Sequence, residues 1–181
     1  MLQYMKQGIA DPERKKLYIK LLSDTWEIAD QARRLQLDDI STRYYHDVRK
    51  KRTQDLAAYN TNVLMHILES FNDDLAVSGL LSDSNIDAVL KRHEDTQKFM
   101  FLQTWSNSYW TTEDEADAQG MLKSELIPVN DLCLFTSAVM LSLMECFDLR
   151  KLMWLLDAYQ HGNVYVSQRA LIGIVFALHI H

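Results

Sequence analysis

The final third of the chain limits the fold more than any other segment, because it combines helical spacing with very little polar surface. Residues 149–159 and 164–178 both repeat apolar side chains at the spacing of a helix, and Gly162-Asn163 forms the expected turn between them. Segment 164–178 is apolar on most sides, so it cannot face water all around. We therefore predict an antiparallel helix pair whose outer surface needs a cover.

The composition indicates an all-α fold of one domain. A chain of 181 residues is long enough for a real core, and its 48% apolar content is ordinary for a folded protein. Five Gly and two Pro are too few for the many tight turns of a sheet-rich fold. No segment shows strand-like alternation of apolar and polar residues. We predict a single domain, residues 1–181, built as an array or bundle of about 6–8 helices.

Caps and apolar spacing predict where these helices lie. Asp11 and Pro12 form a typical helix start, followed by an apolar stripe at three- and four-residue steps. Residues 38–71 are typical of one very long helix or of two helices broken near 60–62. The first helix is expected at residues 12–36, and later ones at 74–81, 84–106, 111–126 and 132–147, the last capped by Asn130 or Asp131.

The last expected helix carries a more specific pattern within Val166–Gly173. Arg169 stands beside the small residue Ala170, and another small residue, Gly173, follows one turn later. Small residues let helix backbones approach closely, and the Arg side chain can reach acidic groups or carbonyls of the preceding turn. The segment resembles the second helix of a HEAT-like repeat, and residues 149–159 are similar to the first helix of that repeat.

The resemblance covers about 50 residues and implies antiparallel helix pairs stacked as in an α-solenoid. Residues 132–147 are similar to the second helix of the preceding repeat. The domain would then consist of a helical-bundle part, residues 12–126, and a HEAT-like repeat part, residues 130–181. The rest of the chain does not show the same unit at a fixed period, so an irregular helical bundle is the alternative.

Residues 4–14 and 43–49 also resemble parts of large uncharacterised helical proteins of Bacteroidetes. That resemblance implies that the chain is an interior segment of a longer polypeptide, and it implies no catalytic residues. The apolar run Ile174–Ile180 reaches the end of the sequence without a Gly or Asn cap and without a polar tail. We therefore expect the C-terminal face to continue in a longer protein or to be covered by a second copy.

Net charge and apolar runs disfavour two classes of partner. A net charge of -6 argues against nucleic acid, because phosphate binding needs concentrated positive charge. No run of 18 apolar residues exists, so no membrane span is expected. Cys133 and Cys146 are separated by roughly 20 Å along one expected helix, which is beyond disulfide reach. Buried reduced thiols and the missing signal-peptide core favour a cytoplasmic location.

Metal and catalytic motifs are weak throughout the chain. Residues 83–94 place oxygen ligands at several positions of an EF-hand-like loop, but Ala88 replaces the Gly that makes the sharp turn. The same residues fit the start of a helix, which we favour. The six His are scattered, and neither a Gly-x-Ser-x-Gly sequence nor a Gly-rich phosphate loop occurs. We expect no catalytic residue, metal or cofactor from local motifs, although sites assembled in space are not visible in a sequence.

Two further segments carry candidate contact residues. One is the basic cluster, which consists of Arg43, Arg49, Lys50, Lys51 and Arg52. It fits nucleic-acid or acidic-peptide binding, or a solvated helix face paired with Asp47 and Asp55, which we favour. The other is the aromatic segment, which consists of Trp105, Tyr109 and Trp110. It fits a recognition groove or, more commonly, an anchor that holds a helix end in the core.

These patterns favour a protein-interaction scaffold without catalytic activity of its own. Its partner would be another protein, the remainder of a longer chain or a second copy bound through the C-terminal apolar face. The candidate contact residues on that face are Arg169, Phe176 and Ile180. One alternative is an enzymatic or ligand-binding helical bundle, which would need inward-facing carboxylates or His in a shared cavity. The other is a nucleic-acid-binding module that uses the basic cluster.

Overall fold

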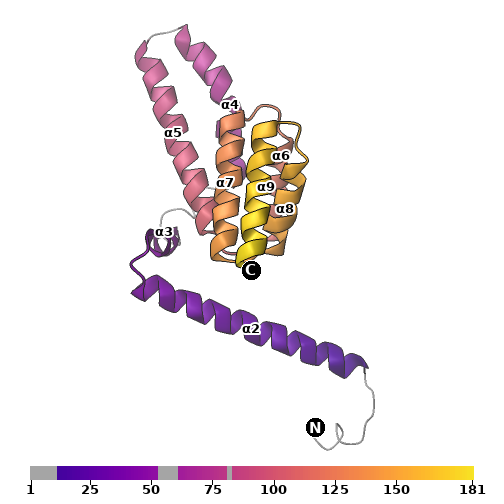
Figure 1. Cartoon of the computed structure of the whole chain (residues 1–181). Coiled ribbons are helices and arrows are strands. Elements are labelled where there is room, and N and C mark those ends of the chain that lie inside the picture. Colours follow the sequence, from indigo (N-terminus) through magenta and orange to yellow (C-terminus); the bar gives the residue numbers. More distant parts are fainter. Residues whose placement is uncertain (1–11, 53–60, 81–82) are drawn as a thin grey trace, which may run out of the picture. The chain divides into compact units, whose positions relative to one another are not determined.

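The computed structural model of the chain describes residues 12–52, 61–80 and 83–181. These ranges hold eight helices and no strand, which confirms the all-α prediction (Figure 1). The residues form two compact units, Met1–Asp47 and Val48–His181, where the sequence predicts one domain. The second unit contains the helix pair on which the sequence prediction centres.

The first unit consists mainly of α2, Pro12–Ile40. This helix starts at the predicted proline and extends past residue 36. His46, at the start of the following α3 (Tyr44–Arg52), places its Nδ1 2.8 Å from Asp38 Oδ1 near the end of α2. The apolar stripe expected along α2 is exposed, including Leu17, Leu21, Ile28 and Leu35.

The second unit is built from two rows of helices. Its described helices are α4 (Thr61–Gly79), α5 (Asp83–Ser106), α6 (Thr112–Lys123), α7 (Val129–Glu145), α8 (Leu149–Tyr159) and α9 (Val164–Ile180). One row is α4, α6 and α8, and the other is α5, α7 and α9, with each helix packed against the next in its row. The rows are joined where α4 packs against α5, α7 against α8, and α8 against α9.

Side-chain caps explain where three of these helices start. Thr111 and Asp114 form a capping box at α6, because each side chain accepts a hydrogen bond from the other residue's backbone N–H. The Asp148 side chain accepts the Arg150 N–H at the start of α8. The Asn163 side chain caps α9 in the same way. These caps confirm the starts predicted for these three helices.

The structure excludes one of the two helix arrangements that the sequence allowed for residues 38–71. The chain is not one continuous helix from 38 to 71, since α2 ends at Ile40 and α3 begins only at Tyr44. The rest of the stretch between α3 and α4, residues 53–60, lies outside the described residues. Helix α4 then continues to Gly79, so the separate short helix expected at residues 74–81 is wrong.

Two boundaries around Pro128 also differ from the prediction. Helix α6 ends at Lys123 rather than near residue 126, because Ser124 adopts extended backbone. Helix α7 starts directly after Pro128, so Asn130 and Asp131 lie inside its first turn and do not cap it. The Asp131 side chain instead points into the protein, where it is fully buried.

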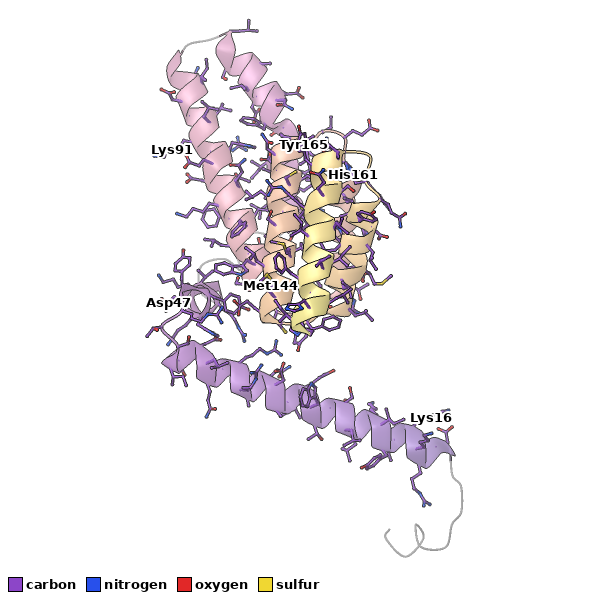
Figure 2. The ribbon with its side chains drawn as sticks, viewed as in Figure 1. Lys16, Asp47, Lys91, Met144, His161 and Tyr165 are labelled. Atoms are coloured by element: carbon purple, nitrogen blue, oxygen red, sulfur yellow. The ribbon has the colours of Figure 1, made fainter. Side chains whose placement is uncertain are left out.

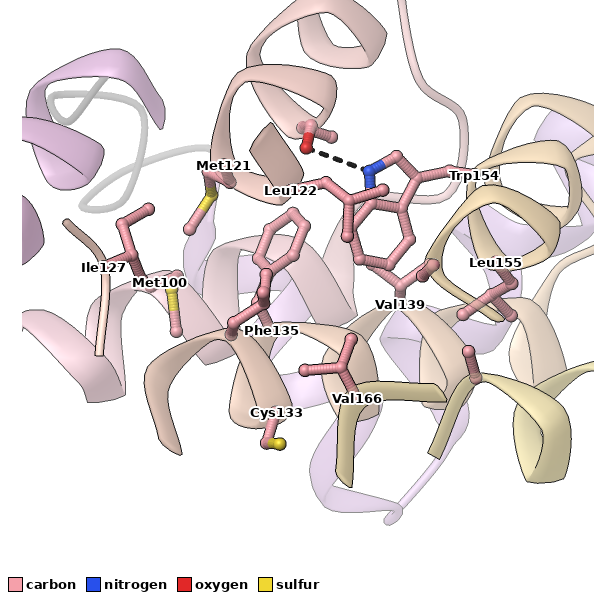
Figure 3. Packing of buried hydrophobic residues seen from close by; sticks show 14 of the residues in the cluster. Met100, Met121, Leu122, Ile127, Cys133, Phe135, Val139, Trp154, Leu155 and Val166 are labelled. Atoms are coloured by element: carbon pink, nitrogen blue, oxygen red, sulfur yellow. Dashed lines mark hydrogen bonds between the residues drawn. The ribbon is translucent and has the colours of Figure 1, made fainter. Parts of the chain in front are cut away.

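Three aromatic rings form the centre of the core in the second unit. Trp110, Phe135 and Trp154 have ring centroids 5.2, 6.2 and 6.5 Å apart, and the Trp154 pairs are edge to face. The Trp154 indole N–H donates to the Ala118 carbonyl at 2.9 Å (Figure 3). Contacts among these rings therefore pack α7 and α8 against each other and against α6 and the loop before it.

Gly173 is the point where α9 approaches α7 and α8 most tightly. A Cβ atom at this position would lie 3.1 Å from Met140 Cβ on α7 and 3.1 Å from Leu155 Cδ1 on α8. Those distances are too short for ordinary carbon contacts. The sequence-based interpretation of Gly173 as a residue that permits close backbone approach is confirmed.

We predict opposite effects for the same substitution at two helical glycines. In the Gly120→Ala variant of α6, the new Cβ atom would contact only the Met65 side chain, with Sδ at 3.5 Å. The higher helix propensity of alanine should therefore raise the free energy of unfolding by about 0.5–1 kcal/mol. Gly173→Ala should lower it by about 1 kcal/mol, because overpacking against Met140 outweighs that gain. Urea unfolding followed by circular dichroism measures both values, and a stabilised Gly173→Ala variant would contradict the close-packing argument.

Candidate docking surface

Helix α9 has one buried side and one exposed side. The buried side consists of small or branched residues that pack toward α7 and α8, namely Val166, Ala170, Gly173 and Ala177. The opposite side follows steps of four and three residues and forms what we call the α9 ridge, namely Val164, Gln168, Leu171, Val175 and Leu178. All five side chains are exposed, and four of them are apolar.

Helix α8 repeats this arrangement on its own exposed side. Leu149, Met153 and Leu156 again follow steps of four and three residues and are exposed. Because α8 and α9 are the last members of the two rows, their exposed sides lie at the same end of the unit. We call the large apolar exposed residues of both helices the apolar end face: Leu149, Met153, Leu156, Tyr159, Val164, Tyr165, Leu171, Ile172, Val175, Phe176, Leu178 and Ile180. Figure 2 labels Tyr165 of this set, at the start of α9.

The charged side chains of α8 and α9 are bonded at the edges of this face. Arg150 lies 3.1 Å from Glu115 of α6, and Asp157 accepts a hydrogen bond from Gln119 of the same helix. Arg169 donates to the Ser137 hydroxyl of α7 at 2.8 Å, rather than to an acidic group or carbonyl of the preceding turn. Neither ridge therefore carries a charged residue at its centre.

A buried lysine fixes the position of α8 behind the apolar end face. The Lys151 side chain is fully buried, and its ammonium group donates to the carbonyls of Asn107 and Ser108 and to the Ser142 hydroxyl. The ammonium also lies 5.9 Å from the Trp110 ring centroid, within cation–π range. One charge thereby joins α8 to α7 and to the loop that follows α5.

Two residues just before Lys151 tie the same loop to α8. The Asp148 carboxylate accepts the Trp110 backbone N–H at 2.7 Å, in addition to capping α8. The Arg150 guanidinium donates to the Trp110 carbonyl at 2.9 Å. Sequence reasoning missed Lys151, although its spacing from Trp154, Leu155 and Ala158 places it on the buried side of α8 and could have revealed it.

The aromatic segment serves the core more than the surface. Trp110 is only 5% exposed and packs in the aromatic centre. It therefore anchors a helix end in the core and does not act as a surface contact residue. Trp105 is partly buried and packs near Phe101, while Tyr109 is exposed. These three aromatic residues therefore do not present one common surface.

The basic cluster falls on α3 and its flank. Lys50 and Lys51 are exposed, Arg49 is partly buried, and Arg43 precedes the helix. Arg52 ends α3. The expected pairing with Asp55 lies outside the described residues.

No group of three or more metal-ligating side chains occurs in the described ranges. Residues 83–94, which resemble an EF-hand loop in sequence, lie within the helix α5. The expected helical interpretation of this segment is confirmed. The His66 ring lies 3.1 Å from Glu69 on the same helix, as their spacing predicts.

A buried polar cluster that sequence reasoning missed lies between α5 and α7. His93 Nε2 is 3.2 Å from Asp131 Oδ2, and Gln97 donates to Asp131 Oδ1. The Phe71 ring stacks on His93 with centroids 3.6 Å apart and covers it. An open groove of about 480 Å³ lies nearby between α4 and α5, yet neither His93 nor Asp131 lines it. This cluster is therefore not arranged to meet a substrate in that groove.

The two cysteines are free and buried, as the sequence predicts. Burial raises the pKa of the Cys133 thiol, although the nearby Arg169 guanidinium acts in the opposite direction. A thiol with a raised pKa is mostly protonated at neutral pH, so Cys133 is a poor nucleophile.

Comparisons of the chain with models of protein families, with characterised proteins and with solved structures yield no match. Among the described helices, none is long and apolar enough to cross a membrane.

We predict that Lys151 is needed for stability. Lys151→Met removes three hydrogen bonds and leaves the Ser108 carbonyl without its lysine donor, while the Asn107 carbonyl keeps the Ser142 hydroxyl, so it should lower the free energy of unfolding by about 2 kcal/mol. The matched control is Lys98→Met on the exposed side of α5, which should change stability by less than about 0.5 kcal/mol. Urea unfolding of both variants measures the difference, and equal stabilities would show that the buried ammonium contributes nothing.

Proposed function

We propose that this protein is an interaction module that docks a helical protein surface on its apolar end face. The observation that carries the proposal is the exposure of twelve large apolar side chains on α8 and α9, the last helices of the two rows. At roughly 150–200 Å² for each such side chain, and about half of it exposed, they expose on the order of 1,000 Å² in total, spread over more than one side of α9. The largest apolar patch of a typical monomer is about 300–600 Å².

The chemistry of the face favours a protein partner over nucleic acid. Its ridges lack exposed lysine or arginine, and the nearby exposed Arg150 and Arg169 are already bonded to Glu115 and Ser137, so the face offers little charge to neutralise phosphate groups. The four- and three-residue steps on both helices match the spacing at which helices pack side chains between one another. The expected occupant is therefore another helical surface.

The row arrangement supports the HEAT-like interpretation as part of this proposal. In stacked helix pairs, each pair buries its apolar sides against its neighbours, and the end pair needs either a polar outer face or a cover. The pair α8 and α9 has an apolar outer face, so we propose that a docked partner supplies the cover. The enzyme alternative has less support, because His93 and Asp131 do not line the open groove between α4 and α5, and the hollow that His93 does line holds only about 10 Å³.

Cysteine footprinting tests this function without knowledge of the partner. Leu178 on the apolar end face is 65% exposed, and Leu126, between α6 and α7, is 64% exposed. In native cells, Leu126→Cys should react with N-ethylmaleimide at the rate of an exposed thiol, whereas Leu178→Cys should react about tenfold or more slowly because a partner covers it. Cys133 and Cys146 are buried and contribute little background.

Equal modification rates for the two introduced cysteines in cells would disprove docking on this face. Circular dichroism of the purified variants confirms that both retain the parent helix content. The unfolded variants provide the reference rate for a fully accessible thiol at each position.

A further inference from the structure

We infer that the occupant of the apolar end face is a second copy of this chain, with the two α9 helices packed antiparallel about a two-fold axis at Leu171. This inference rests on the proposed docking function and adds the identity of the partner and the geometry of the contact. The interface is isologous, so the same residues contribute from both copies.

The spacing of the α9 ridge gives the position of the axis. Val164 lies seven residues before Leu171 and Leu178 lies seven residues after it, so the two ends of the ridge are equally far from its central residue. Antiparallel pairing with Leu171 at the axis places Val164 of each copy beside Leu178 of the other. This register covers the whole length of the ridge.

The helix α8 fits the same axis. Leu155, in the middle of α8, lies against Gly173 in the middle of α9, so the centres of the two helices are level. Because α8 runs antiparallel to α9, an axis that crosses α9 at Leu171 crosses α8 about two residues after Leu155. This places the exposed Leu156 of the two copies close together, and α8 and α9 of both copies then form a four-helix arrangement.

Charge and area both favour a second copy. Two-fold pairing brings a surface against itself, so any net charge on it would repel its own image. The ridges of α8 and α9 carry no charged residue, and Arg150, Asp157 and Arg169 are bonded to α6 or α7. The two ridges carry seven of the twelve apolar side chains behind the value of about 1,000 Å², and a stable dimer buries about 800 Å² on each partner, so side chains beside the ridges have to join the contact.

Gln168 is the one polar position of the α9 ridge. In the proposed register it lies about one turn from the axis, beside Val175 of the second copy, so burial of its amide lowers the stability of the contact.

Sedimentation of the full chain tests the dimer. The parent should sediment as a dimer, whereas Leu178→Asp and Val175→Asp should raise the dimer dissociation constant by about a hundredfold or more, since each buries two unpaired carboxylates. Leu126→Asp, the matched control away from the face, should stay dimeric. Circular dichroism establishes that each variant keeps its helix content.

Cross-linking tests the geometry independently of these variants. Leu171→Cys should be joined to itself by a short bismaleimide, because the two helix axes are about 8–10 Å apart at the two-fold axis. Val164→Cys alone should not be joined, since its two copies lie about 21 Å apart along the helices. A mixture of Val164→Cys and Leu178→Cys chains should be joined again.

A parent chain that sediments as a monomer at micromolar concentration overturns this inference. If Leu178→Cys is nevertheless protected in cells, the docking function holds and the partner is a different protein. A dimer that persists in Leu178→Asp also overturns it, because another surface, such as the exposed apolar side of α2, then joins the copies. Self-linking of Val164→Cys would show parallel helices and rule out the proposed axis.

Discussion

The ammonium group of Lys151 lies where the backbone leaves α5 and exposes carbonyl oxygens that have no helical partner. Asn107 and Ser108 supply two of these oxygens, and Ser142 of α7 supplies the third acceptor. A buried charge is costly unless all its donors are used, so α7, α8 and the loop after α5 have to be in place together. The fully hydrogen-bonded ammonium group of Lys151 therefore holds α8, and with it the apolar end face, in position.

Much of the fold could be predicted because short-range patterns determine where its helices start. Thr111, Asp148 and Asn163 stand directly before apolar repeats, and each caps the helix that the sequence predicts. Asp131 shows the limit of such reasoning. It resembles a cap, yet its carboxylate is used by His93 and Gln97 of a helix more than 30 residues earlier.

The candidate site was partly predictable for a similar reason. Helical spacing alone identifies Leu171, Val175 and Leu178 as one apolar side, and packing within the second unit leaves all three side chains exposed. The assignment of Trp110 to a surface could not be judged from sequence, because an aromatic residue at a helix end suits both a groove and a core. Its burial depends on Phe135 and Trp154, which become neighbours only in the folded unit.

The end-of-row position of α8 and α9 also bears on how large an assembly this chain can build. A surface that joins to a different surface on the next molecule leaves a new open end each time, and such contacts propagate into fibres. In the two-fold pairing that we propose for α9, both molecules use the same surface in a single contact. Growth would then end at two molecules, and apolar side chains that would otherwise promote precipitation would form the interior of a closed particle.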